Sequence, residues 1–165
     1  MADEQIPGPD HAELAAAARK LVRAQASGVL CTLSTRKPGW PIGSLVSYAL
    51  TQRGDPVFLF SELSQHTRNL RADARASLFV QEGGARNPQA AGRVALVGRV
   101  APVPEAEVAE AKARYVAVHP EGKSFAELGD FSFWQLAVED AHVVGGFAKA
   151  GWLTAEEFTG AGPEP

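Results

Sequence analysis

The sequence has little of what marks a secreted, membrane-spanning or nucleic-acid-binding protein. It has one cysteine, Cys31, which excludes an internal disulfide and fits a reducing cytoplasm. It has no apolar run long enough to span a bilayer, and its acidic, proline-broken start is not a signal peptide. It has no basic excess, because 16 Lys and Arg face 19 Asp and Glu. We therefore expect a cytoplasmic protein that binds no nucleic acid and no membrane.

The signatures of several enzyme classes are also missing. Without a G-x-G-x-x-G or Walker loop, a Rossmann domain or P-loop enzyme is not expected. There is no Ser-His-Asp grouping and no G-x-S-x-G elbow. His11, His119 and His142 have no ligand-like spacing, so no metal site is predicted. His142 lies in an apolar strand and is interpreted as a structural histidine rather than a haem ligand.

What the sequence contains is a series of short strands with a few helices inserted. A helix is predicted from its cap Asp10 to Gly28, which should end it. Further helices are expected over 64–75 and 104–118, and strands over 28–34, 42–50, 57–61, 76–82, 93–103, 131–140 and 141–153. Tight turns join most of the strands, which favours an antiparallel barrel. We expect a flexible N-terminus over 1–9, a single domain over 10–158 and a disordered tail over 159–165.

The most informative stretch is FLFSELSQHTRNL, residues 58–70, where a strand passes into a helix. Ser64 is a natural N-cap. His66 and Arg68 put cations in the first turn, where the helix dipole favours anions. A phosphate bound there would reverse that penalty, held by Ser61, Ser64, His66, Thr67 and Asn69. The alternative is a surface helix whose arginines serve solubility and whose histidine is solvated.

The order of motifs resembles that of the FMN-binding split-barrel proteins related to pyridoxamine 5'-phosphate oxidase. The branch that includes bacterial haem-degrading proteins is the most similar. The resemblance is carried by PIGSLVSY, SELSQHTRNL and RVALVG, and it extends over about residues 15–155. It implies a mainly β fold, an antiparallel split β-barrel of Greek-key type with flanking helices. It also implies FMN as cofactor and a homodimer with the flavin site between the subunits.

The resemblance places individual residues against the flavin. The phosphate would lie against Ser61, His66, Thr67 and Asn69, and the segment Gly43-Ser44-Leu45 would follow the flavin edge through backbone amides. Arg93 could reach polar flavin atoms or pair with a carboxylate. Trp134 could lie near the flavin ring, but it is interpreted as a core aromatic, and Cys31 is interpreted as a small core residue. No catalytic residue is assigned.

Two departures from the family pattern bear on function. The oxidases carry an Arg-Lys pair where this chain has Gln65-His66, and no basic residue follows Lys149 to hold a substrate phosphate. Vitamin B6 oxidation is therefore not expected. Haem-degrading relatives often continue into a further C-terminal domain, whereas this chain stops. We predict an FMN oxidoreductase that passes hydride or electrons to a small-molecule acceptor. The alternatives are haem binding or degradation on the same fold, and a non-enzymatic module that has lost flavin.

Overall fold

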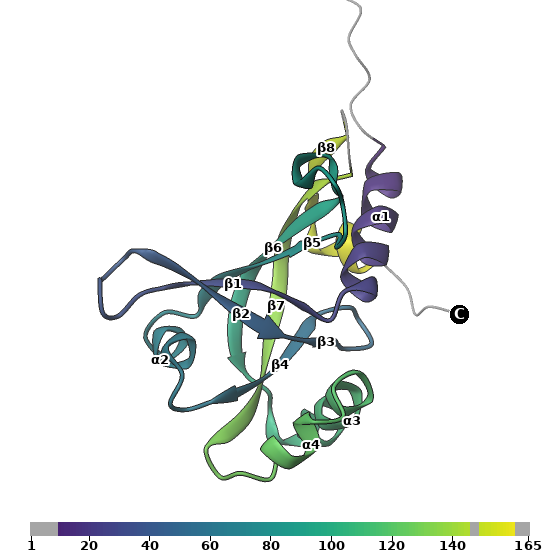
Figure 1. Cartoon of the computed structure of the whole chain (residues 1–165). Helices are drawn as coiled ribbons and strands as arrows, with labels where there is room; N and C mark the ends of the chain where they lie inside the picture. Colours follow the sequence, from purple (N-terminus) through teal and green to yellow (C-terminus); the bar gives the residue numbers. More distant parts are fainter. Residues whose placement is uncertain (1–9, 146–148, 161–165) are drawn as a thin grey trace, which may run out of the picture.

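The fold is one antiparallel, eight-stranded sheet curled into a half-barrel, with helices at its ends (Figure 1). The computed structural model describes residues 10–145 and 149–160. The strand order is β2-β1-β5-β6-β7-β4-β3, and β8 pairs with β7. The strands are β1 (Ser27–Leu33), β2 (Pro41–Ser47), β3 (Ala49–Leu50), β4 (Pro56–Ser61), β5 (Arg75–Gln81), β6 (Arg93–Pro102), β7 (Phe131–Val144) and β8 (Ala150–Thr154). The predicted split-barrel fold is confirmed.

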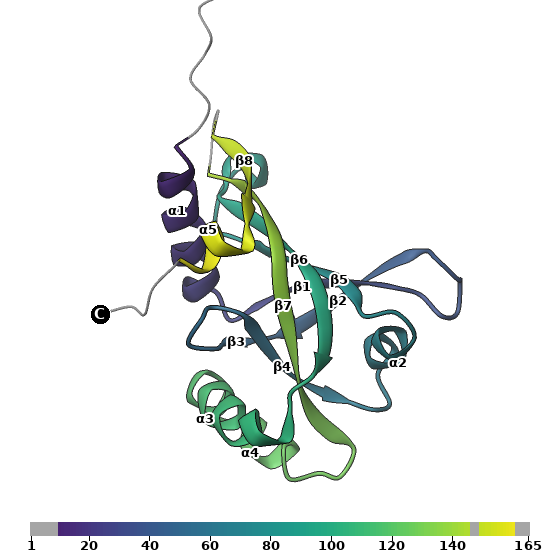
Figure 2. The same ribbon diagram turned by 180° about the vertical axis from the view of Figure 1, so that it is seen from behind.

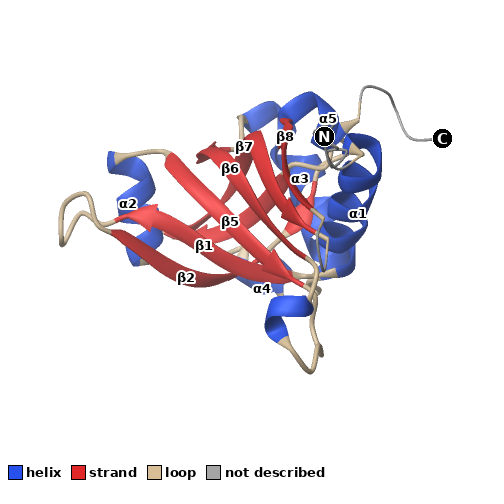
Figure 3. Ribbon diagram, turned by 90° about the horizontal axis from the view of Figure 1, so that it is seen from above, coloured by secondary structure: helices blue, strands red, loops and turns tan. Residues whose placement is uncertain are grey.

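Helices cover the sheet at separate places. They are α1 (His11–Ala24), α2 (Gln65–Ala72), α3 (Val108–Val118), α4 (Gly122–Phe125) and α5 (Ala155–Thr159), with 3-10 turns at Pro88–Ala90 and Glu105–Glu107. Seen from above, α2 lies at one end of the sheet and α1 with α5 at the other (Figure 3). The view from behind shows α3 and α4 below β4 (Figure 2). None of the helices in the described ranges is long and apolar enough to cross a membrane.

Helix α1 begins as predicted but ends earlier. The Asp10 carboxylate accepts hydrogen bonds from the amides of Ala12 and Glu13, which caps the first turn. The helix ends at Ala24, so the prediction that Gly28 terminates it is wrong. Gly28 lies in β1, where a Cβ would come within 2.7 Å of the Phe79 carbonyl oxygen. Glycine is needed there for close strand pairing.

The core lies between the inner face of the sheet and helices α1 and α5. Its largest fully buried side chain is Trp134, which confirms the core interpretation of that residue. The buried Tyr48 hydroxyl donates to the Val22 carbonyl at 2.7 Å and so ties the sheet to α1. Arg19 in α1 donates to the carbonyls of Glu157 and Phe158 in α5, at 3.0 and 3.1 Å. The first and last described helices are thus joined directly.

A buried carboxylate supports the sheet where β4 begins. Asp55 is only 8% exposed, and its Oδ1 accepts a hydrogen bond from the Val138 amide at 3.2 Å. Burial raises the pKa of the Asp55 carboxyl above its ordinary value, while Arg53 and the Val138 amide oppose this shift. The Asp55 side chain therefore accepts the hydrogen bond that the Val138 amide of β7 would otherwise donate to a carbonyl of a neighbouring strand.

The last third of the chain differs most from expectation. The two strands predicted over 131–153 form one strand, β7, up to Val144, followed by the shorter β8. The strand predicted over 93–103 is β6, and its pairing with β7 has a register shift between Val97 and Gly98. Helices α4 and α5 were not predicted, and α5 ends at Thr159, where the tail was expected to begin. The predicted flexible N-terminus 1–9, and residues 161–165 of the predicted tail, lie outside the described residues.

Candidate functional site

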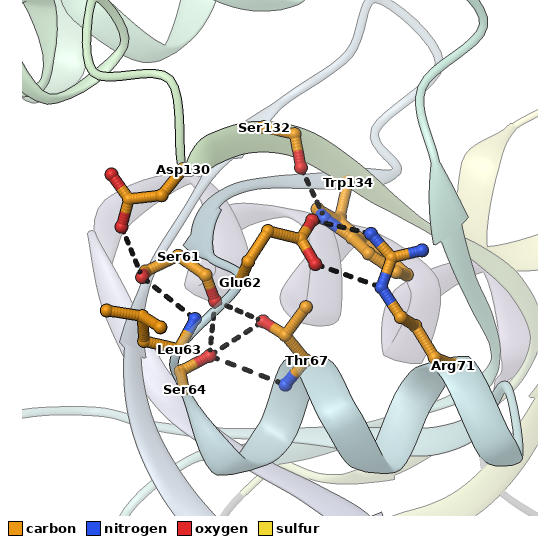
Figure 4. A network of polar contacts seen from close by, with 9 residues as sticks. All are labelled: Ser61, Glu62, Leu63, Ser64, Thr67, Arg71, Asp130, Ser132 and Trp134. Carbon is orange, nitrogen blue, oxygen red and sulfur yellow. Dashed lines mark hydrogen bonds and ion pairs between the residues drawn. The ribbon is translucent and has the colours of Figure 1, made fainter.

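The turn between β4 and α2 is held by its own hydroxyl groups (Figure 4). As predicted, Ser64 caps α2, and its Oγ accepts from the Thr67 amide. The hydroxyls of Ser64 and Thr67 lie 2.6 Å apart, and both donate to the Ser61 carbonyl, at 2.9 and 2.8 Å. The Ser61 hydroxyl donates to Asp130 at 3.0 Å. The hydroxyls expected to meet a phosphate are therefore engaged within the protein.

Asn69 is fully buried and joins α2 to the end of β1. Its Oδ1 accepts from the backbone amide and hydroxyl of Thr35, at 3.0 and 3.2 Å, and from Gln65 Nε2 at 2.9 Å. Its Nδ2 donates to the Thr32 hydroxyl at 2.9 Å. Every polar atom of this side chain has a partner inside the protein. The contacts give Asn69 a structural task, separate from the ribityl contact that the resemblance implies.

His66 is half-buried, with its ring 4.4 Å from that of Phe60 in an edge-on arrangement. Burial lowers the pKa of the His66 imidazole, which keeps the ring neutral at neutral pH. A neutral ring adds no charge for a phosphate. In the described structure, the backbone amides of Gln65 and His66 have no hydrogen-bond acceptor. These two amides are what the helix start can offer to an anion.

The cations near α2 are mostly neutralised. Arg71 binds Glu62 through Nε at 3.0 Å and Nη2 at 2.5 Å, and its guanidinium lies 5.3 Å above the Trp134 ring. Arg75 hydrogen-bonds Asp73 and lowers the pKa of that carboxyl to about 2. Arg68 points into solvent. The cluster thus carries little uncompensated positive charge.

The remaining predicted contacts lie away from α2. Gly43 and Leu45 are on β2, paired with Cys31 and Val29 of β1, and Ser44 between them pairs with Leu30. Arg93 begins β6 at the far end of the β5–β6 pair, about 20 Å along the strands from Arg75. Its Nη1 donates to the Gln89 and Ala91 carbonyls rather than to a carboxylate. Within one copy of the chain, Arg93 and the α2 cluster do not meet.

The sheet carries a second feature that sequence reasoning missed, an apolar row on the side away from the core. The row crosses six strands in register and consists of Leu45, Val29, Phe79, Ala95, His142 and Trp152. Leu45 is 78% and Trp152 58% exposed. We call the side of the sheet that carries this row the outer face. The available signal in the sequence was the alternation of inward-facing and outward-facing residues along β7 and β8. Which residues of different strands lie side by side cannot be inferred from any one segment.

The outer face also corrects two interpretations. Cys31 is half-buried on this face, between Gly43 and Ser77, and not in the core. His142 lies with its ring 4.9 Å from that of Trp152. Within the described residues its ring nitrogens have no hydrogen-bond partner, so the structure gives no support to the interpretation of a satisfied structural histidine.

Comparison with known proteins identifies related chains. The family described as "CREG, beta-barrel" matches residues 9–160. The chloroplastic haem oxygenase HOZ of Arabidopsis thaliana is 32% identical over 154 residues, which are 89% of this chain and 46% of HOZ. A haem-binding protein from Mycobacterium smegmatis superposes with a TM-score of 0.82 at 32% identity, covering 93% of this chain and 62% of the other. The protein Atu2129, of unknown function, from Agrobacterium tumefaciens has a TM-score of 0.78 at 26% identity, covering 96% and 63%. This chain thus spans about half the length of HOZ.

Proposed function

The chain belongs to the CREG beta-barrel family, and we propose that it binds haem on the outer face of its sheet. The observation that carries the proposal is the apolar row across six strands, which is open to solvent at both ends. Two relatives at 32% identity are named for haem binding or haem oxygenation. A large exposed apolar patch on a protein of ordinary composition usually marks an interaction site.

The residues of the outer face suit the chemistry of haem. Haem is a broad, apolar ring with an iron that takes an imidazole ligand and with two anionic propionates at one edge. The row supplies flat apolar contacts, an imidazole at His142 and an aromatic ring at Trp152. Arg93 lies on the same face and supplies a cation. When bound, haem would contribute a redox-active iron, and the protein would orient it and restrict its access to water.

We also propose that a second copy of the chain covers the other part of the outer face. Leu45 and Val29, on β2 and β1, are 78% and 38% exposed and form the end of the row opposite Trp152. Burying these side chains against the same patch of another copy would follow the usual two-fold arrangement of homodimers. Haem would then lie on the β6–β7–β8 part, at the edge of the dimer. A cytoplasmic location is proposed too, which the free thiol of Cys31 supports.

FMN remains the second candidate, with transfer of hydride or electrons to a small acceptor as its activity. The observation in its favour is the pair of backbone amides of Gln65 and His66 at the start of α2. Against it stand the internal partners of Ser61, Thr67 and Asn69 and the neutral state of His66. The outer face therefore provides more groups suited to binding haem than the start of α2 provides for binding flavin.

Titration with haemin and with FMN separates the two candidates. We expect the purified protein to give a Soret band distinct from that of free haemin and to saturate at one haem per chain. FMN fluorescence should stay unquenched at the same concentrations. Quenching of FMN fluorescence together with an unchanged haemin spectrum would show that the protein binds FMN and not haem. A protein that binds neither would be the non-enzymatic module.

A further inference from the structure

His142 lies near one end of the outer-face row. It pairs with Ala95 on β6 and with Trp152 on β8. Ala95 is a small neighbour, and the Trp152 ring lies 4.9 Å away at an angle of 49°. A half-buried imidazole without a hydrogen bond in the described residues is unusual, because buried polar groups are normally paired. A ring nitrogen of His142 is therefore available to bind the metal ion of a cofactor.

The other three histidines of the chain are less suited to bind iron. His11 is exposed, and its Nδ1 lies 2.8 Å from the Glu157 carboxylate. His119 is 7% exposed, and its Nε2 lies 2.8 Å from the Tyr48 carbonyl. His66 has no such partner in the part of the chain that the structure describes, but it faces the Phe60 ring, and burial lowers its pKa. It is the one serious rival, since a neutral imidazole can also bind iron.

A cation lies close to His142 on the same face. Arg93 pairs with Val144 on β7, two residues beyond His142, so the two side chains are diagonal neighbours across the β6–β7 pair. The Nη1 atom of Arg93 is fixed by two carbonyls of the preceding turn. The rest of the guanidinium has no acceptor in the described structure. It can therefore pair with a carboxylate of the ligand.

From this juxtaposition, and resting on the proposed haem function, we propose that His142 is the protein ligand to the haem iron. Ala95 and Trp152 would line the site on either side of His142, and the Arg93 guanidinium would be the group available to a propionate. The site then combines an iron ligand, an aromatic wall and a counter-ion on one face. This arrangement accounts for an imidazole that has no hydrogen bond within residues 10–145 and 149–160, beside an exposed tryptophan.

The test compares histidine variants by absorbance and electron paramagnetic resonance. His142→Ala should bind haemin more weakly by more than about tenfold, since even the loss of an outer partner costs a metal site that much. Its Soret band and iron signal should change, and added imidazole should restore them. His66→Ala and His11→Ala should keep the wild-type spectra. His142→Met retains an iron-binding side chain and should give a distinct spectrum if the alanine variant is unstable.

Each outcome separates the ligand from the function. Haem spectra that are unchanged in both His142 variants, or lost in His66→Ala, would overturn the assignment while leaving haem binding in place. A wild-type protein that does not bind haemin would overturn both. Trp152 gives an independent reading, because a Trp152→Ala variant lacks the aromatic wall and should bind haemin more weakly. Trp40→Ala is the matched control, since Trp40 is 59% and Trp152 58% exposed, and it should bind haemin as the wild type does. Equal haemin affinity in wild type and Trp152→Ala would place haem elsewhere.

Discussion

The side chain of Asn69 fastens helix α2 to the turn after β1, through hydrogen bonds from the amide and hydroxyl of Thr35, at 3.0 and 3.2 Å. Asn69 has no exposed surface, and its Nδ2 is satisfied by Thr32. A side chain that a flavin should touch is thus fully used by the protein. The two roles lead to opposite expectations for its removal.

Replacing Asn69 with alanine should lower the free energy of unfolding by about 1–3 kcal/mol, because the buried Thr32 hydroxyl loses its donor and the Thr35 amide loses its acceptor. Urea unfolding measures the change. Arg68→Ala, on the exposed side of the same helix, is the matched control and should stay within about 0.5 kcal/mol of wild type. Unchanged stability together with lost FMN binding would show that Asn69 contacts the flavin and does not stabilise the fold.

His66 should titrate below 6.5, because burial lowers the pKa of its imidazole. The unfolded chain then takes up the proton more readily than the folded one. The stabilisation is complete above pH 6.5 and is lost as the pH falls through the lowered pKa. Proton NMR of the ring gives the midpoint, and His66→Phe should remove this part of the pH dependence of unfolding. A midpoint above 6.5 would mean that an anion holds the ring charged.

Asp55 should have the opposite effect on stability. Burial raises the pKa of its carboxyl, so the folded state binds the proton more tightly than the unfolded one. Stability from this group is therefore greatest at low pH and falls as the pH rises from 3.8 through the raised pKa. Asp55→Asn keeps an acceptor for the Val138 amide and cannot ionise. Urea unfolding should show that the free energy of unfolding of Asp55→Asn, relative to that of the wild type, is higher at pH 7 than at pH 4. An equal difference at both pH values would contradict the shift.

Leu45→Glu should convert the proposed dimer to a monomer, because it puts a charge at the 78% exposed end of the row. Light scattering after size exclusion gives the mass of each species. Leu63→Glu is the matched control, since Leu63 is 72% exposed but lies in the β4–α2 turn. It should leave the dimer intact. A dimer that survives Leu45→Glu and dissociates with Leu63→Glu would move the interface to that turn.

Local signals in the sequence predicted much of the fold. Asp10 and Ser64 cap helices as their side chains and positions indicate. Glu110 and Arg114, spaced by one helical turn, lie 2.8 Å apart. The order of motifs led to the split-barrel family, which the family match confirms. Each of these features depends on neighbours within a few residues or on a pattern shared across a family.

What could not be predicted depends on partners distant in the chain. Gly28 has the sequence signal of a helix end, but the structure needs glycine there because β5 lies too close for a Cβ. Cys31 and His142 resemble core residues because apolar neighbours surround both in sequence, yet register across the sheet turns them to the outer face. Helix α5 is too short to form alone and exists because Phe158 is buried against α1 and the sheet. Its role in the fold could not be read from the sequence.

The hydrogen bonds from Arg19 to the α5 carbonyls set a condition on how the protein matures during translation. The apolar side of the first helix leaves the ribosome early, while the α5 carbonyls that bind Arg19 are made 138 and 139 residues later. Until then the cover of Leu14, Ala18 and Val22 is incomplete, because only the earlier strands can pack against them, and chaperones or nascent neighbours can bind the part left open. Such distant closure predicts slow, all-or-none acquisition of structure late in synthesis.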